Sequence, residues 1–127
     1  MKKSRDFWVF FLAGLYDCLI GLIFFFAGSQ LFKQFNVPAP NHWGYIQFGA
    51  LILVIFGLMF FAVAFRPNQN RNLIPFGILL KLSYIGLTTY YWATSGLPGL
   101  FQPFVLIDAV MLVLFILAYC SPQAAAN

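Results

Sequence analysis

The chain has 127 residues, of which 62% are hydrophobic and only 8% are charged. Soluble domains carry a charge on roughly a quarter of their residues, so this composition excludes an ordinary soluble domain and indicates a protein of the lipid bilayer. The net charge of +4 lies mostly at the ends of apolar runs, a pattern that does not favour a nucleic-acid surface.

Four apolar segments follow one another along the chain, at residues 7–28, 45–65, 73–92 and 103–119. Each is close to the roughly 20 residues that an α-helix needs to cross about 30 Å of hydrocarbon. Backbone amides must be bonded within a span, and four segments are too few for a closed barrel. The sequence therefore predicts a single all-α domain over residues 1–127, an antiparallel bundle of four transmembrane helices.

The basic start of the first segment resembles a secretory signal peptide, but its apolar run is longer than the 7–15 or so residues typical of one. We therefore expect a retained helix. Residues 29–43, which follow it, are too short and polar to cross a bilayer. Their apolar side chains, among them Leu31, Phe32 and Phe35, predict an interfacial segment between the first two helices that covers the outer mouth of the bundle.

The orientation follows from the basic residues in short loops, which are retained on the cytoplasmic side. In the predicted topology only Lys33 falls on one side, and the other side holds Lys2, Lys3, Arg5, Arg66 and Arg71. The sequence thus predicts a multi-pass protein of the cell membrane with both termini in the cytoplasm.

Three ionisable residues, Asp17, Lys81 and Asp108, lie inside the apolar spans. Each costs at least about 2.5 kcal/mol at mid-membrane unless it is paired or hydrated, so we expect all three to face the interior. Asp17 and Lys81 fall at matching depth, and the long Lys81 side chain has the alternative of reaching toward Asp108. With both carboxylates ionised the triad would carry a net charge of minus one, which predicts a titrating carboxylate or a cationic guest.

Other polar residues extend this region. In the third segment Tyr84 and Thr88 follow Lys81 at intervals of three and four, the spacing of one helix face. Gln47 in the second segment adds an amide. The predicted ligand-binding or charge cluster comprises Asp17, Gln47, Lys81, Tyr84, Thr88 and Asp108.

Small residues mark a second feature of the first segment. Gly14, Gly21 and Gly28 share the face of Asp17 and would let a neighbouring helix come close, within one chain or between chains.

Signatures of catalysis or metal binding are scarce. The single histidine, His42, does not make up the three or four convergent ligands of a metal site. Cys18 and Cys120 lie at different depths, which disfavours a disulfide. No catalytic residue is predicted.

Three roles for the charged triad stay open at this point. It could fix which helices are neighbours, since interhelical polar contacts contribute about 0.6–2 kcal/mol each. It could form the polar end of a pocket, or relay protons or ions through Asp17, Lys81 and Asp108.

Several motifs resemble those of small bacterial four-helix membrane proteins of the DoxX-like type. They are the Tyr16-Asp17 pair in a glycine-spaced helix, the run from Arg71 through Gly77 to Lys81-Leu82, and Asp108. The resemblance implies a bacterial inner-membrane protein. Some members resemble a membrane subunit of thiosulfate:quinone oxidoreduction, which would imply a partner protein, a quinone and a small membrane enzyme.

The interpretation that the residues favour is non-catalytic. We expect an accessory subunit of a membrane complex, or a binder of a hydrophobic ligand such as a quinone, isoprenoid or lipid. Its partners would be the lipid bilayer and either another protein or further copies of the chain, with no nucleic acid.

Overall fold

The computed structural model describes residues 4–121, and these residues form four long helices with no β-strand. The elements are α1 (Arg5–Gln34), α2 (Trp43–Phe65), the 3-10 turn η1 (Arg71–Leu73), α3 (Ile74–Thr94) and α4 (Gln102–Cys120). All four helices are long and apolar enough to cross a membrane, which confirms that part of the prediction. The bounds of α2, α3 and α4 lie within two residues of those expected.

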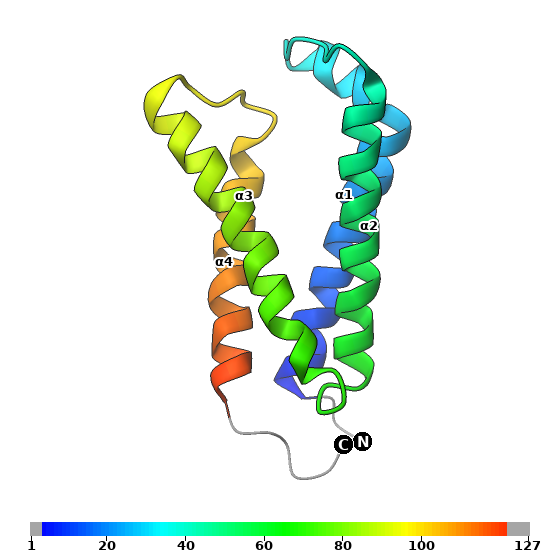
Figure 1. The fold of residues 1–127 in the computed structure, drawn as a ribbon, viewed down its shortest axis with the longest axis vertical. Helices are drawn as coiled ribbons and strands as arrows, with labels where there is room; N and C mark the ends of the chain where they lie inside the picture. Colours follow the sequence, from blue (N-terminus) through cyan, green and yellow to red (C-terminus); the bar gives the residue numbers. More distant parts are fainter. Residues whose placement is uncertain (1–3, 122–127) are drawn as a thin grey trace.

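The helices are arranged as two pairs, α1 with α2 and α3 with α4 (Figure 1). The pairs converge at the end of the molecule where α1 begins, here called the lower end. They diverge toward the opposite, upper end, where the α1–α2 and α3–α4 connections lie.

The first helix is longer than predicted. The expected end at residue 28 is wrong, because α1 continues to Gln34 through a kink at Ala27 (φ −126°, ψ 17°). Kinks are common at Gly/Ser pairs, and Gly28-Ser29 follows directly. Just beyond the end of the helix, Asn36 has a φ of 57°, and the N–H of the following Val37 donates to the Phe32 carbonyl oxygen, with 2.8 Å between nitrogen and oxygen. Part of the predicted interfacial segment, residues 29–34, is thus the last part of α1.

Small residues allow α1 and α2 to pack backbone against backbone. A Cβ atom on Gly14 would lie 2.9 Å from the Gly57 carbonyl oxygen, and one on Gly21 would lie 2.5 Å from that of Ala50. These four residues, the glycine seam, are spaced seven apart on each helix. Glycine is required here because any larger side chain would push the helices apart.

A buried apolar cluster joins the four helices below mid-height. At its centre Phe10, Phe60 and Phe115 are fully buried, and the Phe115 ring centroid lies 4.8 Å from that of Phe10 and 5.0 Å from that of Phe60. We call this cluster the lower core; its members are Phe10, Ala13, Phe60, Val63, Ala64, Ile74, Phe115 and Ala118. It seals the space between the two helix pairs at the lower end.

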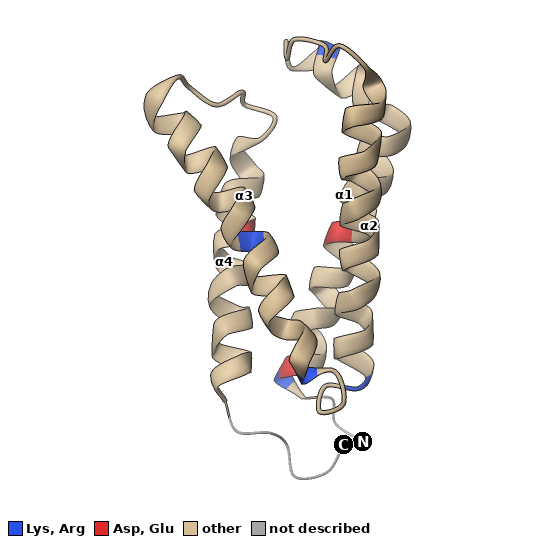
Figure 2. Ribbon diagram, viewed as in Figure 1, with Lys and Arg blue, Asp and Glu red and all other residues tan. Residues whose placement is uncertain are grey.

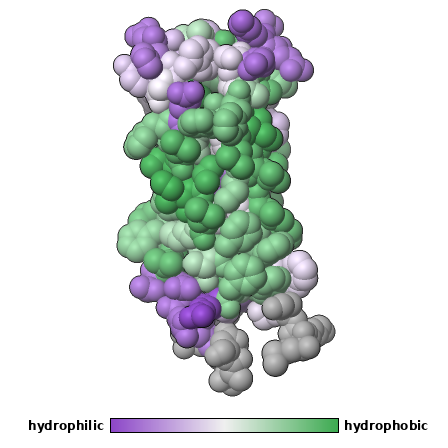
Figure 3. Space-filling view, turned by 90° about the vertical axis from the view of Figure 1, so that its right-hand side faces the viewer, coloured by the Kyte–Doolittle hydropathy of each residue, from purple (hydrophilic) through white to green (hydrophobic). Residues whose placement is uncertain are grey.

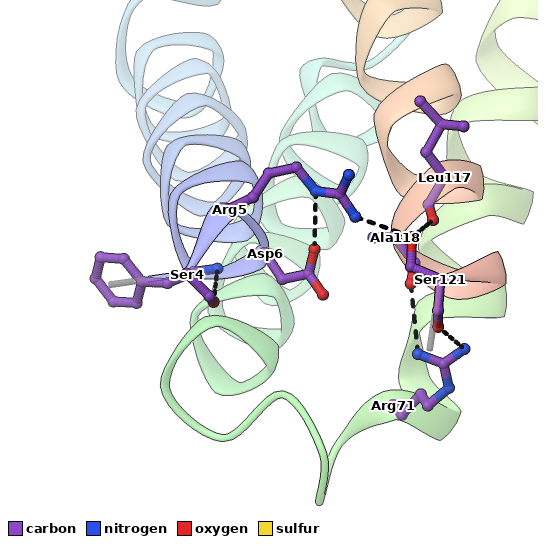
Figure 4. Close-up of polar contacts among 8 residues, drawn as sticks. Ser4, Arg5, Asp6, Arg71, Leu117, Ala118 and Ser121 are labelled. Carbon is purple, nitrogen blue, oxygen red and sulfur yellow. Dashed lines mark hydrogen bonds and ion pairs between the residues drawn. The ribbon is translucent and has the colours of Figure 1, made fainter. Parts of the chain in front are cut away.

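Two arginines hold the end of α4 at the lower rim (Figure 4). The Arg71 guanidinium donates to the carbonyl oxygens of Ala118 (3.4 Å), Tyr119 and Ser121 (3.2 Å), while Arg5 donates to the Ser121 hydroxyl at 2.9 Å. The last carbonyls of a helix have no partner within the helix and attract positive charge. Arg71, the first residue of η1, therefore caps α4.

Charge and hydropathy divide the molecule into zones. An apolar belt surrounds its middle between polar ends (Figure 3), with exposed side chains such as Phe26 (76%) and Leu106 (66%). Arg5, Arg66 and Arg71 lie at the lower end, and Lys33 lies in the last turn of α1 at the upper end (Figure 2). The predicted anchors Lys2 and Lys3 lie outside the described residues.

Candidate functional site

The three charges predicted inside the apolar spans meet at mid-height (Figure 2). Lys81 Nζ donates to Asp17 Oδ1 at 2.9 Å, to Asp17 Oδ2 at 3.2 Å and to Asp108 Oδ1 at 3.1 Å. Asp17 and Lys81 are 1% exposed and Asp108 is 7% exposed. Lys81 thus binds both carboxylates at once, and we call this group the Asp–Lys–Asp cluster.

Helix periodicity explains why each of these side chains points inward. Asp17 lies between Gly14 and Gly21 of the glycine seam on the buried side of α1. In α3 Lys81 follows Gly77 by four residues, and a Cβ on Gly77 would lie 2.6 Å from the Phe60 ring. In α4 Asp108 precedes the buried Phe115 by seven residues. Residues at these intervals share one face of a helix.

The Lys81 ammonium is enclosed on all sides. Its three donors match three carboxylate oxygens, and Nζ lies 5.5 Å from the ring centroid of Tyr16 and 5.8 Å from that of Phe60. A cation over an aromatic face is attracted by the negative potential of the ring. The positive charge is therefore held within the protein and does not line open space.

A cavity of about 370 Å³ lies directly above the cluster, between the two helix pairs. Ligand pockets typically measure roughly 300–1,000 Å³ and combine an apolar wall with a few polar groups. This cavity fits that description, since Asp17 and Asp108 line it together with Ser83. Aromatic residues supply much of the wall: Tyr16, Phe24, Phe32, Tyr84, Phe101 and Phe104.

The cavity is closed below and open to one side. The lower core lies beneath it. At the upper end Phe32 of α1 and Phe101, before α4, both line the cavity, with ring centroids 6.1 Å apart. Gly49 of α2 and Leu87 of α3 line the cavity and are also exposed. The opening therefore lies between the upper halves of α2 and α3, within the apolar belt.

The structure brings four of the six predicted site residues together and leaves two apart. Tyr84 lines the cavity and donates its hydroxyl to the Phe101 carbonyl oxygen at 3.0 Å. Thr88 is outside the cavity lining, and its hydroxyl donates to the Tyr84 carbonyl oxygen of its own helix at 2.6 Å. Gln47 is exposed and does not line the cavity, although its neighbour Ile46 does.

Tyr16 is a site residue that the sequence reasoning did not select for the cluster. Its hydroxyl is buried and, among the described residues, has no hydrogen-bond partner. Buried polar groups are nearly always bonded, so an orphan hydroxyl beside a cavity requires an explanation. The spacing of Tyr16, Ile20 and Phe24, four residues apart, could have revealed this face, but such runs equally describe a helix surface in contact with lipid.

The remaining candidate residues have structural roles. His42 is the N-cap residue that precedes α2, and its Nδ1 accepts a hydrogen bond of 2.9 Å from the Gly44 N–H. Cys18 and Cys120 are free thiols, and Cys18 Sγ lies 3.6 Å from the Val54 carbonyl oxygen. Within residues 4–121 no group of His, Cys and Asp side chains is arranged to hold a metal ion.

Comparison of the chain with protein-family models, with curated proteins and with solved structures gave no match. The similarity to DoxX-like proteins thus stays a prediction from the motifs alone.

Proposed function

We propose that the chain is a multi-pass integral membrane protein that binds a hydrophobic ligand with a polar head in the cavity between its two helix pairs. The observation that carries the proposal is a cavity of about 370 Å³ with aromatic and aliphatic walls and two carboxylates at its floor. The protein is non-catalytic in this proposal and acts alone or as an accessory subunit of a membrane complex.

The proposed topology is an antiparallel bundle with the lower end in the cytoplasm. Arg5, Arg66 and Arg71 gather at that end, and short basic loops are retained on the cytoplasmic side. The apolar belt between the ends supports burial in a bilayer (Figure 3). In a bacterium this membrane is the inner membrane, and the upper end with Lys33 faces outward.

The position of the opening supports a ligand that arrives through the bilayer. Gly49 and Leu87 place the opening within the apolar belt, where acyl chains and the tails of quinones, isoprenoids and lipids are found. A quinone, together with a partner protein, is the ligand that the DoxX-like resemblance implies.

A purely structural role for the Asp–Lys–Asp cluster has less support. The glycine seam already joins α1 to α2, and the lower core already joins these helices to α3 and α4. Polar contacts between membrane helices contribute only about 0.6–2 kcal/mol each. The cluster is thus one of several contacts that join the helices, whereas a polar floor is needed to orient a ligand.

A proton or ion relay through Asp17, Lys81 and Asp108 also has less support. The lower core lies between the cluster and the lower end, and Phe10, Phe60 and Phe115 at its centre are 0% exposed. A relay needs polar groups on both sides of the charged residues, whereas the described members of this layer are apolar side chains.

Two glycines offer a matched test of ligand binding. Gly49 and Gly86 are both exposed, and a Cβ added to either meets nothing within 4 Å, but only Gly49 lines the cavity. In native mass spectrometry of protein extracted with its membrane lipids, we expect a bound species in the wild type and in Gly86→Phe. The same species should be lost or reduced at least tenfold in Gly49→Phe, because its ring would fill the opening.

Loss of the bound species in both variants, or in neither, would contradict the proposal, since the phenyl ring would then act independently of the cavity. Release of a bound protein rather than a small molecule from Gly49→Phe would favour the subunit role.

A further inference from the structure

The charges of the Asp–Lys–Asp cluster are unequally distributed with respect to the cavity. Two carboxylates share one ammonium, so with both ionised the cluster carries one net negative charge. Asp17 and Asp108 line the cavity, whereas Lys81 does not and is 1% exposed. A molecule in the cavity therefore meets acceptor oxygens, with the cation behind them.

Asp108 is the carboxylate that a guest would contact. Its Oδ1 accepts from Lys81, but within the described part of the chain its Oδ2 has no hydrogen bond. Both oxygens of Asp17 are bonded to Lys81. The side chain of Asp108 is also more open, at 10% exposed compared with 2% for Asp17. One free carboxylate oxygen, on a residue more than nine-tenths buried, thus borders the cavity.

The walls around this oxygen are suited to a positive charge. Phe104 lies at the centre of an aromatic group, with its ring centroid 6.1 Å from that of Phe24 and 6.3 Å from that of Tyr16. Phe24 in turn lies 6.4 Å from Phe101. Aromatic faces attract organic cations and recognise alkylated ammonium groups in particular.

We propose that the head of the ligand is an alkylammonium group whose nitrogen lies against Asp108 Oδ2, with its alkyl chain directed toward the opening between α2 and α3. This inference rests on the proposed function and specifies the chemistry of its ligand. One positive charge would neutralise the cluster. Ligands whose heads carry a negative charge and no cation, such as a carboxylate, are not expected, because they would place like charges together in a medium that screens them weakly.

Three probes that share an octyl chain separate the charge of the head from its hydrophobicity. They are octyltrimethylammonium, octan-1-ol and octanoate, measured by equilibrium dialysis against the protein in phosphatidylglycerol nanodiscs and against empty nanodiscs. These discs contain no lipid amine. We expect the cation to bind at least tenfold more tightly than the alcohol, with no saturable binding of octanoate.

Asp108→Asn should abolish the preference for the cation over octanol. Asp6→Asn is the matched control, because Asp6 lies at the lower end near Arg5 and away from the cavity. It should retain the full preference. The ratio between the probes in the wild type decides the inference even if Asp108→Asn fails to fold.

The outcomes distinguish this inference from the proposed function. If octanol binds as tightly as the cation and Gly49→Phe removes both, the cavity binds hydrophobic ligands but the inference about the head is overturned. A preference that persists in folded Asp108→Asn overturns it too. If none of the probes binds saturably, the proposed function fails as well.

A last experiment distinguishes two sources of the alkylammonium group, a lipid head and a free amine. In nanodiscs of phosphatidylethanolamine, weaker apparent binding of octyltrimethylammonium would show competition by the lipid ammonium. Unchanged binding would point to a free amphiphilic amine.

Discussion

Lys81 is the residue on which the charge balance of the interior depends. It is the only cation bonded to Asp17 and Asp108 among the described residues. Lys81→Met keeps the length of the side chain but leaves two buried carboxylates without a counter-charge. Breaking a buried ion pair by removing one partner typically costs about 3–5 kcal/mol. We expect the variant to unfold at a much lower temperature than the wild type in detergent.

The two aspartates should respond differently to the same substitution. Asp108→Asn removes the excess negative charge, and the asparagine Oδ1 can still accept from Lys81, so its unfolding temperature should equal or exceed that of the wild type. Asp17→Asn replaces the carboxylate that accepts at both oxygens and should be less stable than Asp108→Asn. The reverse order would contradict the assigned geometry. A relay is not expected, so neither variant should alter proton flux into liposomes.

Part of this site could be predicted from the sequence. The cost of an unpaired charge in hydrocarbon is so large that Asp17, Lys81 and Asp108 had few alternatives to facing one another. Hydroxyl and amide groups are less constrained. Thr88 bonds its own helix and Gln47 is exposed, because local bonds or the membrane interface satisfy such groups equally well. Tyr16 could not be assigned to the site from the sequence, because a tyrosine in an apolar run can face either the lipid or the protein interior.

At the scale of the elements, the glycine seam determines how α1 and α2 pair. Gly57→Leu should separate them, because its Cβ alone would contact Cys18 Sγ and lie 2.9 Å from the Gly14 carbonyl oxygen. Overpacking of this kind typically costs about 1–3 kcal/mol. We expect a lower unfolding temperature and faster labelling of Cys18 by a membrane-permeant maleimide.

Gly86→Leu is the control for that substitution, since it adds the same side chain to a helix where nothing lies within 4 Å. Leucine favours a helix more than glycine does, so equal destabilisation of the two variants would show that packing in the seam is not responsible.

The helices themselves were largely predictable, and the reasons for the exception are physical. Hydrophobic length defines a span, so α2, α3 and α4 end near the polar residues that flank them. The polar residues 29–34 of α1 were expected to leave the helix, yet they contain no proline and their backbone amides remain bonded within it. Polarity identifies the membrane boundary but not the end of the helix. The sequence likewise did not indicate that Gly57 packs closely against a neighbouring helix, because its contacts, Gly14 and Cys18, lie on α1.

At the scale of the whole molecule, the proposed topology predicts that the two ends face different compartments. Cys120, in the last turn of α4, is exposed and belongs to the lower end. Lys33→Cys would place a thiol in the last turn of α1, at the upper end. In a Cys18→Ala background, an impermeant maleimide should label Lys33→Cys in intact cells. Cys120 should be labelled only after permeabilisation. Labelling of Cys120 in intact cells would reverse the orientation.

The seven-residue repeat of the glycine seam leaves one ambiguity for the fold to resolve. If α1 slid along α2 by two turns, about 10 Å at 1.5 Å per residue, Gly21 would face Gly57 and Gly14 would face Ala64, so small residues would still meet. Steric fit thus admits a second alignment of nearly equal quality. The slide would carry Asp17 the same distance away from Lys81 and leave the Asp17 carboxylate without its counter-charge, while Lys81 would keep only Asp108. The ion pair between Asp17 and Lys81 therefore selects one of the two alignments as the native one.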